Sequence, residues 1–164
     1  MKEQSIPCLV QSCNYEELSA MDKRLVEEAK IACQGSYSPY SNFRVGAAVL
    51  LEDGTIVRGS NQENASYPNG ICAERTALFF AGSSYPTLQV RAMAIAAKKG
   101  ERFTEMPCPP CGACRQVLLE TENRQDEATI RLILFGTEEC YLIKDGARAL
   151  LPLQFDQKVT NKDN

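Results

Sequence analysis

The chain has 164 residues, with 18 basic and 21 acidic side chains and a formal net charge of −3. Apolar residues make up 44% and charged residues 24%, which is ordinary globular usage and excludes an intrinsically disordered chain. The acidic balance argues against a nucleic-acid polymer as partner, because neutralising phosphates takes a basic surface. We therefore expect one domain over residues 1–164, with an ordered core of about 17–155.

The cysteines and the absence of long apolar runs bear on the compartment and the chemistry. No run resembles a secretory signal or approaches the roughly eighteen residues that span a bilayer, so we expect a cytoplasmic protein with no membrane partner. Eight cysteines in such a protein point to metal binding or catalysis and not to a disulfide framework. Histidine is absent, so acid and base chemistry falls to carboxylates and a transition-metal site to thiolates.

Hydrophobic periodicity and turn residues predict the elements in chain order. Residues 15–34 repeat apolar side chains every three or four positions, which indicates an amphipathic helix that stops at Gly35. Residues 43–51 and 55–59 flank a turn containing Gly54 and are typical of a β-hairpin. The later elements are a helix over 71–81 closed by Gly82, a strand over 90–97, a helix over 112–123 and strands over 130–135 and 141–143.

This order of elements predicts an α/β fold, a three-layer α/β/α sandwich around a mixed five-stranded sheet. The last two strands are joined by few residues and should pair antiparallel. The first dozen residues and the end of the chain from Asp156 are expected to be poorly ordered.

Two cysteine motifs open the second and third predicted helices. Cys72 is followed by Glu74 in one, and Cys111 by Cys114 in the other. A helix N-terminus favours thiolate, and two such helices side by side can direct three thiolates at one ion. Three protein ligands leave the fourth tetrahedral position of Zn²⁺ for water, which is the arrangement of a catalytic site. Cys108 could close the site as a fourth ligand, which spacing alone does not exclude, although a purely structural site has no use for Glu74.

Basic residues follow both motifs. Three thiolates around Zn²⁺ give the centre a net charge of −1, which weakens the metal as a Lewis acid. Arg75 and Arg115 could donate to the thiolate sulfurs and withdraw negative charge, whereas the alternative is that each only caps or pairs at a surface. The other cysteines are expected to be small apolar fillers or free thiols: Cys8, Cys13, Cys33 and Cys140.

Four segments contain more specific motifs: 40–48 (YSNFRVGAA), 59–67 (GSNQENASY), 72–77 (CAERTA) and 110–116 (PCGACRQ). Over about residues 17–155 the chain resembles the small homotetrameric cytidine deaminases, in which three cysteines hold the zinc ion of a zinc deaminase. The resemblance implies their fold, Zn²⁺ as cofactor, a nucleoside substrate and a homotetramer.

The resemblance also implies roles for the residues around the metal motifs. Asn61 and Glu63 match a pair that binds the ribose 3′-hydroxyl, and Phe43 matches an aromatic packed against the pyrimidine. The backbone of Ala73 and the carbonyl before Pro110 match contacts to the base and its leaving amine. Without the family, the first two residues would be a polar turn and Phe43 a core residue.

Three further positions match residues that act across subunit boundaries. Ala65 and Tyr67 correspond to positions near the 5′ end of a neighbouring subunit's substrate, and Phe155 to an aromatic that stacks on the base across an interface. By itself, Phe155 would be assigned to the core.

We therefore expect hydrolytic deamination of cytidine and 2′-deoxycytidine to uridine and 2′-deoxyuridine with release of ammonia, a reaction of pyrimidine salvage, with Glu74 as base and then acid. Alternatives are deamination of another small aminopyrimidine such as blasticidin S, and a non-catalytic Cys₄ zinc-stabilised domain. Pro109 stands where many relatives have serine, and the loop 98–107 is longer than usual near the metal motif. Both departures bear on the substrate range.

Overall fold

The computed structural model describes residues 1–125 and 129–156, so most of the chain end expected to be poorly ordered lies outside the described residues. The helices are α1 (Ala20–Ala32), α2 (Ala73–Ser84), α3 (Gly112–Asn123) and α4 (Gly146–Leu150). The strands are β1 (Gln11–Cys13), β2 (Phe43–Leu51), β3 (Ile56–Ser60), β4 (Val90–Lys99), β5 (Arg102–Phe103), β6 (Arg131–Phe135) and β7 (Cys140–Ile143). Within the described ranges, no helix is long and apolar enough to cross a membrane.

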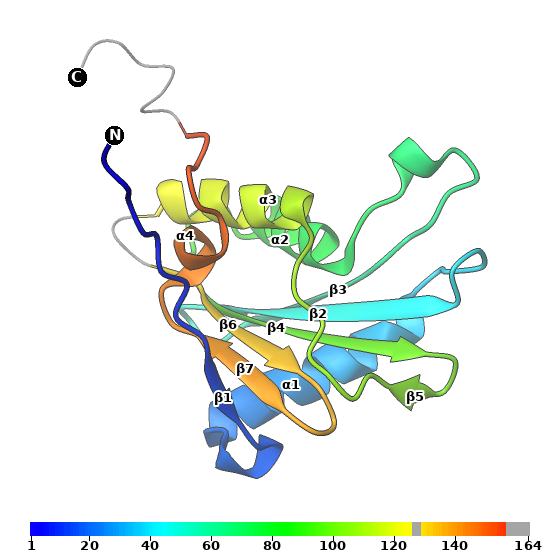
Figure 1. The fold of residues 1–164 in the computed structure, drawn as a ribbon. Helices are drawn as coiled ribbons and strands as arrows, with labels where there is room; N and C mark the ends of the chain where they lie inside the picture. Colours follow the sequence, from blue (N-terminus) through cyan, green and yellow to red (C-terminus); the bar gives the residue numbers. More distant parts are fainter. Residues whose placement is uncertain (126–128, 157–164) are drawn as a thin grey trace.

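The strands form one mixed sheet between two helical layers, with α1 on one face and α2, α3 and α4 on the other (Figure 1). The strand order is β1-β7-β6-β4-β2-β3, and β5 pairs with β4. Strands β4 and β6 are parallel, whereas the other pairs, β6 with β7 included, are antiparallel. The predicted α/β/α class and the antiparallel last pair are confirmed.

The sheet has seven strands, so the prediction of five was wrong in number. All five predicted strands are present, and the two additional ones are short. Strand β1 pairs with β7 at the sheet edge, with Cys13 opposite Cys140, and includes two of the first dozen residues. Strand β5 folds back on β4 around Gly100, whose φ of +61° suits a tight turn. Residues of β1 and β5 are strands because their backbone pairs with another strand, and their sequences show no apolar periodicity that would predict it.

Two helices begin later than predicted, the first because of its capping residue. The side chain of Ser19 accepts a hydrogen bond from the N–H of Asp22, so α1 begins at Ala20 and residues 15–17 form a separate 3₁₀ turn. Helix α2 begins at Ala73 and continues through Gly82, which was expected to close it. Helix α4 was not predicted.

Two glycines let helices pack closely on opposite faces of the sheet. A Cβ on Gly46 in β2 would overlap backbone atoms of α1. A Cβ on Gly59 in β3 would overlap the carbonyl of Ala73 and the N–H of Ala77 in α2. The start of α2, which follows Cys72, is therefore held directly against the sheet.

Candidate active site

Helices α2 and α3 lie on the same face of the sheet (Figure 1), and three thiols meet where these helices begin. Cys72 and Cys111 occupy the N-cap positions of the two helices, and Cys114 lies in the first turn of α3. The Cys111 Sγ lies 3.7 Å from that of Cys72 and 3.4 Å from that of Cys114, and all three sulfurs lie within 4.8 Å of one another. Zn–S bonds of about 2.3 Å in a tetrahedron place sulfurs roughly 3.8 Å apart, so the cluster fits Zn²⁺.

Arg75 provides positive charge beside this cluster. Its Nη2 lies 3.5 Å from the Sγ of Cys72. A hydrogen bond from Cys114, with those from Arg75 and Cys111, lowers the pKa of Cys72 to about 5 against the opposing effect of burial. The geometry therefore favours a thiolate at Cys72, the form that binds metal.

Arg115 makes its hydrogen bonds to backbone carbonyls. Its Nε donates to the carbonyl of Pro110 over 2.9 Å, and its Nη1 donates to that of Leu150 over 2.8 Å. The guanidinium thus ties the loop that leads into Cys111 to the end of α4.

Glu74 is the second residue of α2 and lies beside the thiols. It is only 4% exposed, and burial raises the pKa of its carboxyl. A buried carboxyl with a raised pKa next to a metal site is suited to taking up and releasing protons near neutral pH.

Cys108 does not join the three-thiol cluster. Its Sγ lies 3.9 Å from the carbonyl oxygen of Pro109, and burial raises the pKa of this thiol. This placement supports a site of three thiolates with an open fourth position.

Replacing Cys108 with serine is therefore expected to leave zinc content at one ion per chain. Elemental analysis of the purified variant measures this, with Cys111→Ser as the matched control that loses metal. If Cys108→Ser also loses its zinc, the closed four-cysteine site is the correct one.

A cavity of about 730 Å³ opens in front of these residues. Of the residues expected to bind substrate, four line it: Phe43, Asn61, Glu63 and Tyr67. Five residues in or near the metal motifs also line the cavity: Cys72, Glu74, Arg75, Cys108 and Cys111. Ala65, Ala73 and Phe155 are outside its lining.

Asn61 is fixed by hydrogen bonds on both ends of its amide. Its Oδ1 accepts from the hydroxyl of Ser36 (2.6 Å) and the N–H of Val45 (2.8 Å), and its Nδ2 donates to the carbonyl of Phe43 (3.0 Å). One Nδ2 hydrogen remains for a ligand.

Glu63 is held from the turn before β2. Its Oε1 accepts from the hydroxyl of Ser41 (2.5 Å), and its Oε2 accepts from the N–H groups of Tyr40 (2.9 Å) and Ser41 (3.3 Å). The Ser41 hydroxyl above all, with these N–H groups, keeps the pKa of Glu63 below its usual value. An ionised carboxylate held in this way can accept a further hydrogen bond from a ligand hydroxyl.

Ser36 and Ser41, which hold the two ribose-binding candidates, were not predicted as site residues. Both lie in the turn-rich segment 35–42, where a serine usually signals only a turn. The one sequence signal for a role of Ser41 in the site was its place in segment 40–48, a motif that resembles the cytidine deaminases.

Three thiols at two helix N-termini, beside a buried carboxyl in a cavity, define a zinc hydrolase site. The family description that matches residues 19–126 is "Cytidine and deoxycytidylate deaminase zinc-binding region". A cytidine deaminase of Halalkalibacterium halodurans is 52% identical over 101 residues, which are 61% of this chain and 72% of that protein. One of Sporosarcina psychrophila is 49% identical over 101 residues, covering 62% and 70%.

Solved structures agree with these sequence matches. The crystal structure of a cytidine deaminase from Burkholderia pseudomallei superposes with a TM-score of 0.70 at 37% identity, covering 84% of this chain and all of that one. A cytidine deaminase from Mycobacterium tuberculosis gives 0.64 at 33% identity, covering 82% and 96%. The chain belongs to the cytidine deaminase family. It is an enzyme of that family, and its cofactor is zinc.

Proposed function

We propose that the protein converts cytidine and 2′-deoxycytidine to uridine and 2′-deoxyuridine, with uptake of water and release of ammonia. The observation that carries this proposal is that the buried Glu74 and two thiols of the cluster, those of Cys72 and Cys111, line one cavity of nucleoside size. Zinc, when held by Cys72, Cys111 and Cys114, supplies the Lewis acid that makes water nucleophilic at neutral pH.

In this mechanism Glu74 moves the protons. Its carboxylate takes a proton from the attacking water and delivers it to the ring N3. It then takes the proton of the hydroxyl group now on C4 and passes it to the amino group, which departs as ammonia. Phe43 packs against the pyrimidine, while Asn61 and Glu63 hold the ribose 3′-hydroxyl through the free amide hydrogen and carboxylate lone pairs described above. Ala73 and the carbonyl of Pro109 hold the base and its amino group through backbone atoms.

Charge around the cavity favours a nucleoside over a nucleotide. Among the described residues, Arg75 is the one basic side chain in the cavity lining, and it is engaged with Cys72. A 5′-phosphate would therefore meet no free cation among these residues and would lie in the same cavity as the ionised Glu63.

A substrate panel tests the proposed function. Loss of ultraviolet absorbance is followed with cytidine, deoxycytidine, CMP, cytosine and blasticidin S. We expect turnover of cytidine and deoxycytidine and little of CMP. Turnover of blasticidin S alone would favour the other aminopyrimidine deaminase, and a zinc-loaded protein inactive on the whole panel would favour a non-catalytic domain.

We further propose that the active unit is a cytoplasmic homotetramer whose sites combine residues of neighbouring chains. Tyr67 is 75% exposed and Phe155 64% exposed, and Phe155 lies outside the cavity of its own chain. Large aromatics held outside the core in this way support a role in contacts between chains, with Ala65 beside Tyr67 near a neighbour's substrate.

Complementation between a chain that lacks the proton-transfer group and a chain with weakened substrate binding tests this assembly. In an equal mixture of Phe155→Ala and Glu74→Gln chains, about a quarter of the sites combine an intact Glu74 with a neighbour's intact Phe155. Sites with the parental KM, which neither variant has alone, are therefore expected to appear after subunit exchange. A monomer by sedimentation that still turns over cytidine would contradict the composite site.

A further inference from the structure

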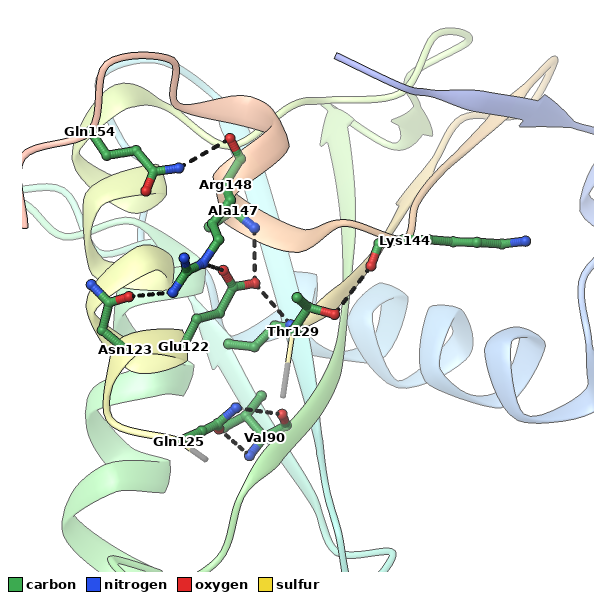
Figure 2. Close-up of polar contacts among 10 residues, drawn as sticks. Val90, Glu122, Asn123, Gln125, Thr129, Lys144, Ala147, Arg148 and Gln154 are labelled. Atoms are coloured by element: carbon green, nitrogen blue, oxygen red, sulfur yellow. Dashed lines mark hydrogen bonds and ion pairs between the residues drawn. The ribbon is translucent and has the colours of Figure 1, made fainter. Parts of the chain in front are cut away.

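Glu122 is a buried carboxylate that lies outside the catalytic cavity. Glu122, in the last turn of α3, is 3% exposed, and its Oε1 accepts from the N–H groups of Ile130 (2.8 Å) and Ala147 (2.9 Å) (Figure 2). Its Oε2 has no hydrogen-bond partner among the described residues and lies 4.0 Å from the Nε of Arg148. Arg148 is also held by Asn123, whose Oδ1 accepts a hydrogen bond from the Nη2 of Arg148 over 2.8 Å. Burying a carboxylate with so few partners costs free energy, so the arrangement needs a reason.

Glu122 supplies the cap that α4 lacks. Asp145, at the N-cap position of α4, makes no side-chain capping bond, and a helix of five residues is not stable without outside contacts. The free N–H of Ala147 is instead taken by Glu122. This contact requires glycine at position 146, because the φ of Gly146 is +64° and a Cβ there would overlap the Oε1 of Glu122. The end of α3 thus caps α4 from a distance.

The first turns of α3 hold the other end of α4 and the residues that follow it. Arg115 donates to the carbonyl of Leu150 over 2.8 Å, and the Nε2 of Gln116 donates to the carbonyl of Phe155 over 2.9 Å. Segment 151–155 is therefore tied to α3 by its backbone, while the side chain of Phe155 stays exposed. A well-anchored segment with an exposed aromatic side chain is suited to contact with another chain.

We propose that Glu122 is a positioning residue for substrate binding. By capping α4 it fixes where segment 151–155 presents Phe155 to the cavity of a neighbouring subunit. This inference rests on the proposed deaminase function and its composite site. Glu122 is not part of the cavity lining and acts through α4, so losing the cap displaces Phe155 and leaves the thiols and Glu74 in place.

Kinetics of five variants test this role. Glu122→Ala is expected to raise KM for cytidine about tenfold, with kcat within about threefold of the parent and zinc content unchanged. Phe155→Ala should give the same shift, and the double variant no larger one, because both remove one interaction. Glu122→Gln keeps an oxygen for the two N–H groups and should retain the parental KM. Glu120→Ala, which removes the carboxylate paired with Arg124 over 3.6 Å on the same helix, is the matched control and should leave KM unchanged.

Mixed oligomers separate an effect across subunits from one within a chain. Glu122→Ala chains mixed with Glu74→Gln chains should yield sites of parental KM, because the second chain supplies an intact segment 151–155. If Glu122→Ala does not fold, Gly146→Ala replaces it, since its Cβ displaces the Glu122 carboxylate.

Two results would overturn the proposal: an unchanged KM in a folded cap variant, or additive effects in the double variant with Phe155. A parent protein that does not deaminate cytidine would instead overturn the proposed function, and this inference with it. The two failures are therefore distinguishable in the first assay.

Discussion

Replacing Glu74 with glutamine is expected to lower kcat for cytidine by about 10⁴-fold or more. A single general acid or base step contributes about 10²–10⁴ in rate, on the order of 3–5 kcal/mol, and Glu74 is proposed to serve several steps. Glutamine keeps the volume and the hydrogen-bonding capacity of glutamate but does not shuttle protons at neutral pH. The loss should fall on kcat, because the contacts proposed for Asn61 and Glu63 are unchanged.

The measurement is steady-state deamination by Glu74→Gln protein that contains one zinc ion per chain. Glu74→Asp is the informative companion, since it keeps a carboxyl group and draws it back by one methylene. Its loss should be smaller than that of the glutamine variant. Glu74→Gln activity within tenfold of the parent would mean that another group moves the protons, and the proposed mechanism would have to be abandoned.

The sequence predicted the metal site best, because its cysteines coincide with the starts of predicted helices. Cys72 and the pair Cys111 and Cys114 precede or open helical segments, and the two strand-helix units bring these starts together. The three thiols could therefore be predicted to meet, and they lie within 4.8 Å of one another. Spacing alone did not exclude Cys108 as a fourth ligand, and the fold places it outside this cluster.

The elements that escaped prediction depend on distant partners. Helix α4 has five residues and no cap of its own, so only the fold, which brings Glu122 to the N–H of Ala147, accounts for it. Strand β1 exists because β7 lies beside it. Apolar periodicity over so few residues contains no comparable signal.

The residues proposed to bind substrate also depend on partners that are distant in the sequence. Asn61 and Glu63 were assigned through the family resemblance, yet what fixes them is Ser36 and Ser41, each more than twenty positions away in the sequence. Two polar turns come together only after the sheet has formed. The residues of a turn therefore predict its local conformation, but they do not predict which distant side chain will form hydrogen bonds with it.

Replacing Cys114 with serine is expected to abolish both stable zinc binding and activity. Zinc bound by four protein ligands in small peptides gains about 10–16 kcal/mol, so removing one ligand should weaken binding by about 10²–10³-fold or more. A serine hydroxyl is a poor replacement, because it is not ionised near neutral pH and is a harder ligand than thiolate. Losing the metal then removes the Lewis acid on which the proposed reaction depends.

The matched control is Cys140→Ser, because Cys114 and Cys140 are equally buried at 0% exposure while Cys140 lies in β7, outside the thiol cluster. Elemental analysis should find one zinc ion per chain in the control and none in Cys114→Ser after dialysis against a chelator. Thermal unfolding adds a second readout, since an ion bound only to the folded chain raises Tm by mass action. A chelator should therefore lower the Tm of the parent and the control but not that of Cys114→Ser. Tightly held zinc in Cys114→Ser, or equal loss from Cys140→Ser, would show that these three thiols are not the ligand set.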